Sequence, residues 1–174
     1  MKIIYLHHAH RDLSDGINQE NGLTKVGIQE AEATRDILKD LDIHAIYVGE
    51  FIRYKLTADI INSHGSPISI DKRLNEVGSE GYTDYKDGME KLNKRTHAFL
   101  NDIIAKHGND ENVLCITSGI NITSFINYFF KGDILKGLSQ VGAIGICPIV
   151  FELDKNAKMK TRKAVGKKRL IIKL

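Results

Sequence analysis

Three histidines and an arginine stand close together near the N-terminus, at His7, His8, His10 and Arg11. A neutral imidazole can attack an electrophile or accept a proton, and it is also the commonest ligand of transition metals. The four residues directly follow an apolar run, residues 2–6 (KIIYL), which predicts a buried strand that ends where the histidines begin. Because functional side chains gather at the carboxyl ends of parallel strands, this cluster is the first candidate for a reactive centre.

Two further apolar runs are followed by polar residues. Arg53 comes shortly after residues 45–48 (AIYV), and Ser118 follows residues 113–117 (VLCIT). In a parallel sheet these ends face one crevice, so we expect Arg53 and Ser118 to lie beside the histidines. Guanidinium groups and the backbone N–H groups of helix N-termini both bond well to phosphate oxygens. The sequence therefore predicts a site for an anionic, phosphate-like ligand.

A metal centre is the competing interpretation of the histidine cluster. Successive residues of a strand point to opposite faces, so His7 and His8 are not expected to share a metal ion. No matching cluster of Asp, His or Cys stands elsewhere, and Cys115 and Cys147 lie within apolar runs, where reduced cysteines are typically buried. No G-x-S-x-G turn surrounds Ser118, which argues against a serine nucleophile. We therefore expect no metal and no other cofactor.

Strand and helix patterns alternate along the chain, which is typical of a parallel α/β sheet. Apolar residues recur at helical spacing from Thr24 to Leu41, with Thr24 as the expected N-cap, and again over Tyr85–Lys106. The other expected elements are a helix at residues 53–63, a helix carrying Ile122, Phe125, Ile126 and Phe129, an edge strand at residues 68–70, and late strands at residues 144–153 and 170–174. Ile28 and Leu56 count among the apolar positions of the first two helices. We expect a single domain over residues 1–174, with three layers and a mostly parallel sheet between helices on both faces.

The composition fits one globular domain. The chain has 174 residues, of which 42% are hydrophobic and 27% charged, and no apolar run approaches the roughly 20 residues that cross a bilayer. The apolar stretch after Lys2 is too short for a signal peptide, so we expect a cytoplasmic protein without a membrane partner. Residues 155–174 are rich in Lys and Arg and contain no acid, but interleaved aromatics are missing. A solvated basic hairpin is favoured over a nucleic-acid interface, and nothing in the sequence indicates an oligomeric state.

Five segments, in order, resemble the motifs of the histidine phosphatase (phosphoglycerate mutase-like) superfamily. The segment YLHHAHR resembles the RHG motif that opens this family, and GLTKVGIQEA resembles the LT-x-x-G-x-x-x-A start of its first helix. IYVGEFIRYKLTADII is similar to the stretch in which a strand leads to an arginine and then Thr-Ala, and LNEVGSEG to the segment that carries a glutamate. VLCITSGINI occupies the place of the strand that ends in His-Gly, so the similarity runs from Lys2 to about Phe130.

The resemblance implies a phosphoglycerate mutase-like fold and a set of residue roles. His8 would attack phosphorus and become a phosphohistidine, and Glu76 would donate a proton to the leaving group. Arg53 would hold the phosphate oxygens, and Thr57 would be structural. The remaining phosphate-binding positions are His7, Ser118 and Arg11. The implied partner is a phosphorylated small molecule or a phosphoprotein.

Two departures from the family pattern fall on residues that would bind the charged transition state. His7 stands where the family has arginine, and Ser118 stands where it has its second histidine, which would make this chain a divergent member. Losing one such contact costs about 3–4 kcal/mol, on the order of a hundredfold to a thousandfold in rate. His7 could carry a proton near neutral pH, and His10 or Arg11 could add charge to the pocket. Two functions therefore stay open: a phosphomonoester hydrolase with weakened activity, or a catalytically silent domain that binds a phosphorylated ligand.

Overall fold

The computed structural model describes residues 1–14, 16, 18, 20–76, 85–131, 148–154, 156 and 159–164. Within these residues, six strands form one sheet in the order β3-β2-β4-β1-β5-β6. Their bounds are Lys2–His7 for β1, Ile43–Val48 for β2, Ile68–Ile70 for β3, Asn112–Thr117 for β4, Ile149–Leu153 for β5 and Met159–Ala164 for β6. Strands β3, β2, β4 and β1 run parallel, whereas β5 pairs antiparallel with both β1 and β6. The predicted mostly parallel sheet is therefore confirmed.

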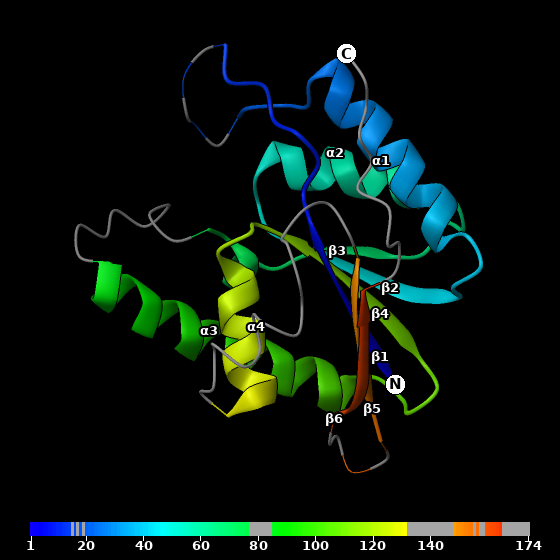
Figure 1. The fold of residues 1–174 in the computed structure, drawn as a ribbon, viewed down its shortest axis with the longest axis vertical. Coiled ribbons are helices and arrows are strands. Elements are labelled where there is room, and N and C mark those ends of the chain that lie inside the picture. The colour runs from blue at the N-terminus through cyan, green and yellow to red at the C-terminus, as the bar shows by residue number, and fades with distance from the viewer. Residues whose placement is uncertain are drawn as a thin grey trace.

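Helices cover both faces of this sheet. Their bounds are Lys25–Leu38 for α1, Ile52–Ile61 for α2, Tyr85–Lys106 for α3 and Asn121–Phe130 for α4, and a short 3-10 helix, η1, spans Lys72–Leu74. Helices α1 and α2 lie on one face and α3 and α4 on the other (Figure 1). The three-layer arrangement expected from the alternating pattern is confirmed.

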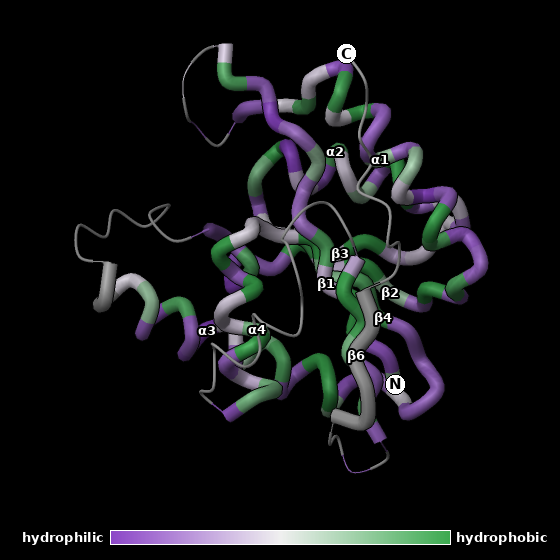
Figure 2. Tube along the Cα trace, viewed as in Figure 1, coloured by the Kyte–Doolittle hydropathy of each residue, from purple (hydrophilic) through white to green (hydrophobic). Residues whose placement is uncertain are grey.

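The central strand β1 is buried on both faces, because its side chains alternate between the two helical layers. Ile3 and Tyr5 belong to the core cluster formed with α3 and α4, whereas Ile4 and Leu6 belong to the cluster formed with α1 and α2. Figure 2 shows the result, with apolar strands in the centre and many hydrophilic residues along the outer sides of the helices. Strands buried in this way leave their ends as the places where polar side chains can meet a ligand.

Helix α1 begins where the sequence predicted, and its first turn packs against the loop after β1. The Thr24 hydroxyl accepts a hydrogen bond from the Gly27 N–H at 3.0 Å. A Cβ added to Gly27 would lie only 2.2 Å from the His10 carbonyl oxygen. The same carbonyl accepts a hydrogen bond from the Thr24 N–H at 3.1 Å. Glycine at position 27 therefore permits a close approach between the helix and the loop that follows the histidines.

The apolar spacing predicted the helices but not their rotation about their own axes. Ile28 and Leu56, which the spacing places on apolar faces, are 42% and 38% exposed. The buried residues of α1 are Gly27, Ala31, Thr34 and Leu38. The expectation for Ile28 and Leu56 is wrong because a periodic pattern defines a broad stripe, whereas tertiary packing selects which part of it faces the sheet.

The remaining elements follow the prediction where the structure describes them. The edge strand at 68–70 and the helix at 85–106 have the predicted bounds. The late strand begins at Ile149, while residues 144–147 and the strand expected at 170–174 lie outside the described residues. The basic segment contributes β6, which pairs antiparallel with β5 and which the sequence patterns did not place at these residues. No helix in the described part of the chain is long and apolar enough to cross a membrane.

Candidate active site

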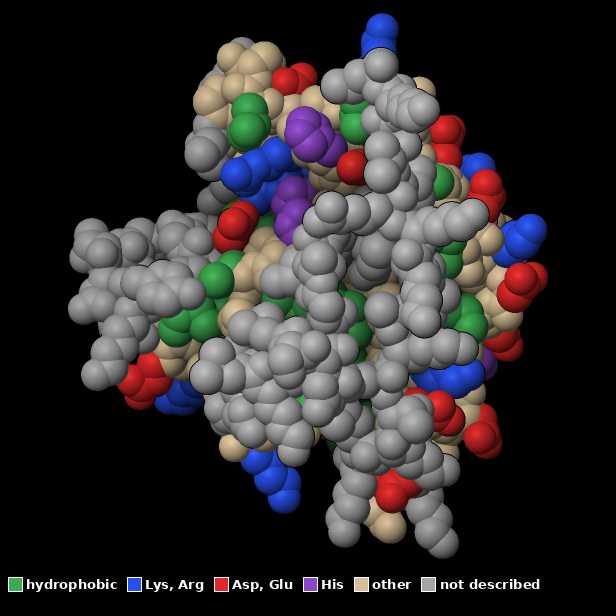
Figure 3. All heavy atoms as spheres, in the orientation of Figure 1, with side chains coloured by type: hydrophobic (Ala, Val, Ile, Leu, Met, Phe, Trp, Pro, Cys, Tyr) green, Lys and Arg blue, Asp and Glu red, His purple; other side chains and the backbone are tan. Residues whose placement is uncertain are grey.

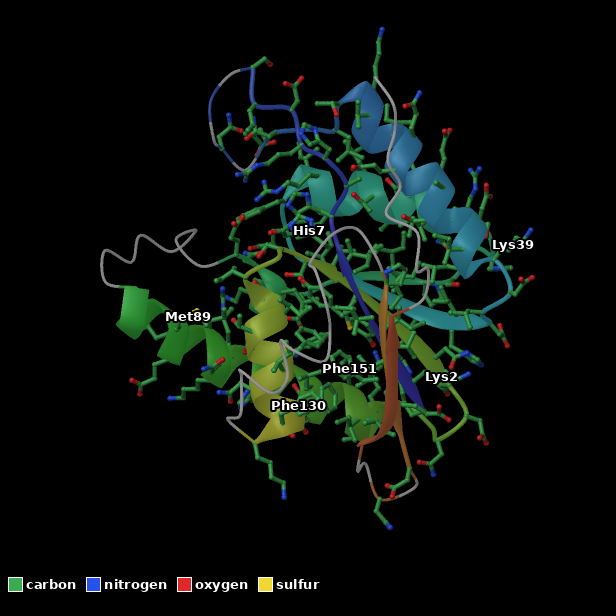
Figure 4. The ribbon with its side chains drawn as sticks, in the orientation of Figure 1. Lys2, His7, Lys39, Met89, Phe130 and Phe151 are labelled. Carbon is green, nitrogen blue, oxygen red and sulfur yellow. The ribbon has the colours of Figure 1, made fainter. Side chains whose placement is uncertain are left out.

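Three strand ends meet at one edge of the sheet, as predicted. Strands β1 and β4 pair as far as His7 and Thr117, and the His8 N–H donates to the Thr117 carbonyl at 2.9 Å. This pairing places His8 beside Ser118, the first residue after β4. Arg53 lies in the first turn of α2, shortly after β2. Figure 4 shows His7 at this end of β1, close to α2, and Figure 3 shows histidine, basic and acidic side chains gathered there.

His8 is a buried, neutral imidazole. Its Nδ1 lies 2.7 Å from the Ala9 carbonyl oxygen, and because a carbonyl only accepts hydrogen bonds, Nδ1 must carry the hydrogen. The lone pair is therefore on Nε2. Burial lowers the pKa of His8 to about 3, and the neighbouring His7 adds to this effect, so the ring stays unprotonated at neutral pH. A neutral imidazole with a free Nε2 meets the requirement for attack on phosphorus.

His7 lies beside His8 rather than on the opposite face. The two ring centroids are 4.2 Å apart, so the expectation from strand alternation is wrong. The reason is that β1 ends at His7, and the alternation does not extend to His8. The Nδ1 of His7 lies 2.6 Å from the His8 carbonyl oxygen, and burial lowers the pKa of His7. His7 is therefore neutral near neutral pH in the free protein, contrary to the idea that it carries a proton there.

The third histidine, His10, turns toward the start of α1. Its side chain is exposed, with Nδ1 3.0 Å from the Thr24 hydroxyl. The His10 backbone N–H donates to the Glu30 carboxylate at 2.8 Å. His10 therefore helps to hold the loop and does not add charge beside His8. In the part of the chain that the structure describes, no group of three or more His, Cys, Asp or Glu is arranged to hold a metal ion.

Arg53 and Glu76 form the charged part of the site. Arg53 is 2% exposed, and its Nη2 donates to Glu76 Oε2 at 2.9 Å. The guanidinium carbon lies 4.5 Å from the Phe51 ring centroid and 4.9 Å from that of Tyr54. Arg11 Nη1 approaches the same Glu76 oxygen at 3.9 Å. The structure thus brings together three predicted site residues that are far apart in the sequence.

Ser118 is almost fully buried, and its polar groups are used within the protein. Its hydroxyl donates to the Asn121 side-chain oxygen at 2.9 Å, and its carbonyl accepts a hydrogen bond from the Tyr5 hydroxyl. Asn121 in turn donates to the Leu74 carbonyl at 3.2 Å. Ser118 therefore lies next to the site, as predicted, but in the free protein its hydroxyl is engaged in the network that supports the segment carrying Glu76.

Thr57 has the structural role expected of it. Its hydroxyl accepts a hydrogen bond from the Ala9 N–H at 3.1 Å and donates to the Arg53 carbonyl at 2.7 Å. The Thr57 side chain thus connects the loop after β1 to helix α2, which carries Arg53. The segment before the glutamate is held in a similar way, because Asn75 accepts from the Glu50 N–H at 2.8 Å and donates to the Glu50 carboxylate at 2.7 Å.

Two buried donors of α2 have no hydrogen-bond acceptor among the described residues: Arg53 Nε and the Tyr54 hydroxyl. The Tyr54 hydroxyl faces the side chains of Arg53 and Ser118, but neither forms a well-aligned hydrogen bond with it. Leaving a buried donor unpaired costs about 1–3 kcal/mol, so a water or an oxygen-rich ligand is expected to supply the acceptor. Sequence reasoning missed Tyr54, because an aromatic residue within a helix suggests packing. Its place directly after Arg53 is the only sequence signal.

Comparison with known proteins gives a partial match to one family and several structural neighbours. Residues 10–87 match the sequence pattern of the histidine phosphatase superfamily (branch 1), and no curated protein matches the chain in sequence. The alpha-ribazole phosphatase from Shigella flexneri superposes with a TM-score of 0.76 at 15% identity, covering 95% of this chain and 96% of that chain. Bacillus stearothermophilus YhfR gives 0.74 at 18% identity, covering 91% and 93%. A phosphoserine phosphatase mutant from Entamoeba histolytica, in complex with phosphoserine, gives 0.68 at 16% identity, covering 95% and 98%. These similarities establish the fold over nearly the whole chain.

Proposed function

We propose that the chain is a member of the histidine phosphatase superfamily, whose sequence pattern residues 10–87 match, and that it is a phosphomonoester hydrolase that works through a phosphohistidine on His8. One observation carries the proposal: His8 is buried and neutral with its Nε2 lone pair free, beside the ion pair of Arg53 and Glu76. A nucleophile, a cation for phosphate oxygens and a carboxyl group are the three parts that such a hydrolysis needs.

The reaction balances with these groups. The Nε2 lone pair of His8 forms a bond to phosphorus while the bond from phosphorus to the ester oxygen breaks. The electron pair leaves with that oxygen, which takes the proton of the Glu76 carboxyl group. A water then attacks the phosphohistidine, gives a proton to Glu76 and releases inorganic phosphate and neutral His8. The Ala9 carbonyl, which accepts from Nδ1–H, holds the ring and stabilises its positive charge while phosphorus is attached.

Arg53 couples phosphate binding to the placement of the acid. In the free protein its Nη2 donates to Glu76, so a phosphate that binds the guanidinium takes over this contact. The Glu76 side chain can then turn toward the ester oxygen. Arg11, 3.9 Å from the same carboxylate oxygen, lies close enough to hold a further phosphate oxygen.

The substrate class is a phosphorylated small molecule or a phosphorylated protein side chain. The structural neighbours include an alpha-ribazole phosphatase and a phosphoserine phosphatase. Their names support a small phosphomonoester as the first class to test.

A catalytically silent phosphate-binding domain is the second candidate, and the state of two residues favours it. Ser118 stands in the place of the histidine of the family pattern, and its hydroxyl donates a hydrogen bond to Asn121. His7 is neutral near neutral pH. The positive charge around a bound phosphate would then come from Arg53 and Arg11, which suits binding better than stabilisation of a highly charged transition state.

Phosphate release separates the two candidates. The wild type, His8→Ala and the matched control His64→Ala are incubated with p-nitrophenyl phosphate, phosphoserine and a panel of sugar phosphates from acid to neutral pH. His64 is exposed, and its ring contacts the Lys39 carbonyl at the C-terminal end of α1. The loss of the His64 side chain is therefore not expected to affect turnover. We expect wild-type turnover that falls on the order of a thousandfold or more in His8→Ala. Equally slow release by the wild type and His8→Ala would rule out the enzyme, and calorimetry with inorganic phosphate would then test the silent domain.

A further inference from the structure

The Tyr54 hydroxyl is a buried donor that the proposed reaction has not yet used. The Tyr54 side chain is fully buried, and its ring centroid lies 5.3 Å from that of His8. The Arg53 guanidinium lies over the same ring, and the hydroxyl faces Ser118. The hydroxyl and Arg53 Nε are both buried and lack an acceptor among the described residues. Two unpaired donors therefore converge beside the nucleophile.

We propose that the Tyr54 hydroxyl donates a hydrogen bond to an oxygen of the phosphoryl group and so supplies the donor that a serine at position 118 does not. This inference rests on the proposed phosphate site. A phosphate held by Arg53 beside His8 would offer acceptor oxygens to both unpaired donors at once. A Tyr hydroxyl can rotate about its C–O bond, so its hydrogen can follow the oxygen that arrives.

The chemistry of the hydroxyl fits a donor. Burial raises the pKa of Tyr54 well above its ordinary value, so the hydroxyl keeps its hydrogen throughout the neutral range. Ser118 cannot take the same part in the free protein, because its own hydroxyl donates to Asn121. A neutral donor in a buried site can still contribute strongly to the binding of an oxyanion.

Packing alone explains the ring of Tyr54 but not its hydroxyl. The ring stacks on Phe51 with centroids 5.2 Å apart and lies under Arg53, contacts that a phenylalanine would keep. A hydroxyl that only filled space would lose its hydrogen bonds to water on folding without a replacement. The comparison of tyrosine with phenylalanine at this position is therefore the direct test.

Tyr54→Phe is compared with wild type and with Tyr47→Phe, the matched control. Tyr47 is also buried, but its hydroxyl bonds His107 at 2.9 Å, beyond the end of α3. Calorimetry measures binding of inorganic phosphate and of vanadate, and thermal unfolding is followed with and without phosphate. We expect Tyr54→Phe to bind phosphate roughly tenfold more weakly or worse, and to lose most of the rise in Tm that phosphate causes. Its Tm without phosphate should be unchanged or higher, because an unpaired buried hydroxyl is removed.

The control should show the opposite pattern, with a lower Tm and normal phosphate affinity, because it loses a hydrogen bond away from the site. Tyr54→Phe binding phosphate as tightly as wild type would overturn the inference. Phosphate binding is measured apart from turnover, so a wild type that binds phosphate but does not hydrolyse p-nitrophenyl phosphate would refute the hydrolase and leave the role of Tyr54 to be decided by the binding data. A wild type that binds no oxyanion would overturn both.

Discussion

The charge of the candidate site rests on few side chains. His7 and His8 are both neutral in the free protein, because burial lowers the pKa of each ring. The guanidinium groups of Arg53 and Arg11 supply positive charge, and the Glu76 carboxylate accepts a hydrogen bond from Arg53. In the free protein, the Arg53 guanidinium is therefore already paired with the Glu76 carboxylate. In the proposed site, a phosphate that binds Arg53 would compete with Glu76.

Replacing Glu76 by Gln should separate binding from catalysis. The variant removes the competing negative charge, so inorganic phosphate should inhibit or bind several-fold more tightly. It also removes the proposed proton donor, so kcat should fall on the order of a hundredfold to ten-thousandfold. Steady-state kinetics with p-nitrophenyl phosphate and competition by phosphate measure the two effects. Glu32→Gln on the exposed side of α1 makes the same charge change and should alter neither, whereas a Glu76→Gln protein with weaker phosphate binding would contradict the competition.

The loop after β1 lies between two helices, and its contacts with them hold the backbone that carries His8. On one side Thr57 of α2 accepts the Ala9 N–H, and on the other side Gly27 of α1 touches the His10 backbone. Neither contact involves a group that reacts. Both hold the backbone around His8, and the proposed in-line attack would need that residue placed to well under an ångström.

Thr57→Val should damage both stability and activity. The change keeps the shape of the side chain but leaves the buried Ala9 N–H without its acceptor, which costs about 1–3 kcal/mol in the free energy of unfolding. The freed loop should also lower kcat. Thr34→Val is the control, since the Thr34 hydroxyl only donates to the Glu30 carbonyl within α1 and its loss should cost less than about 1 kcal/mol. Urea unfolding and turnover are measured for both variants. Equal losses of stability and activity in Thr57→Val and Thr34→Val would argue against a special role for the hydrogen bond between Thr57 and Ala9.

Gly27→Ala should destabilise the fold although alanine is the better helix former. The new Cβ would lie 2.2 Å from the His10 carbonyl oxygen, and backbone atoms cannot move aside as the end of a side chain can. We expect a loss of about 1–3 kcal/mol, larger than the gain of about 1 kcal/mol in helix propensity. Gly22→Ala, whose Cβ would meet only Leu56 Cδ1 at 3.6 Å, should be tolerated. A Gly27→Ala protein as stable in urea as wild type would show that α1 can shift away from the loop.

At the scale of the whole molecule, the fold holds a histidine in a place where it resists protonation. Folded His8 takes up a proton only near pH 3, whereas in the unfolded chain it does so near 6.5. The unfolded state therefore binds more protons below pH 6.5, and stability falls as the pH is lowered. The stabilisation is complete above about pH 6.5 and is lost progressively toward pH 3.

This difference should be visible in the pH dependence of unfolding. Between about pH 7.5 and 5, His8 alone should lower the free energy of unfolding by about 2 kcal/mol. The His8→Ala variant should lose that much of the pH dependence, whereas the exposed His64→Ala should keep the wild-type slope. Denaturant unfolding at a series of pH values gives the slopes. Parallel slopes for the wild type and His8→Ala would show that the histidine is more open to solvent than the fold indicates.

Much of the architecture could be predicted from the sequence, because long periodic patterns and strand ends are local signals. The helix at Tyr85–Lys106 and the N-cap at Thr24 were predictable in this way. The approach of Arg53 to Glu76 was implied by the order of family-like segments, and the distance of 2.9 Å between their side chains agrees with it. The exposure of Ile28 was not predictable, since the rotation of a helix depends on what it packs against.

The sequence by itself determined which elements form, in what order, and which residue types stand at the strand ends. Only the tertiary structure decided that the rings of His7 and His8 lie side by side, that both are neutral, and that the Tyr54 hydroxyl lies unpaired near them. The reason is physical. Helix and strand preferences arise from neighbours along the chain, whereas protonation and hydrogen bonding depend on burial and on partners that only the folded chain brings together.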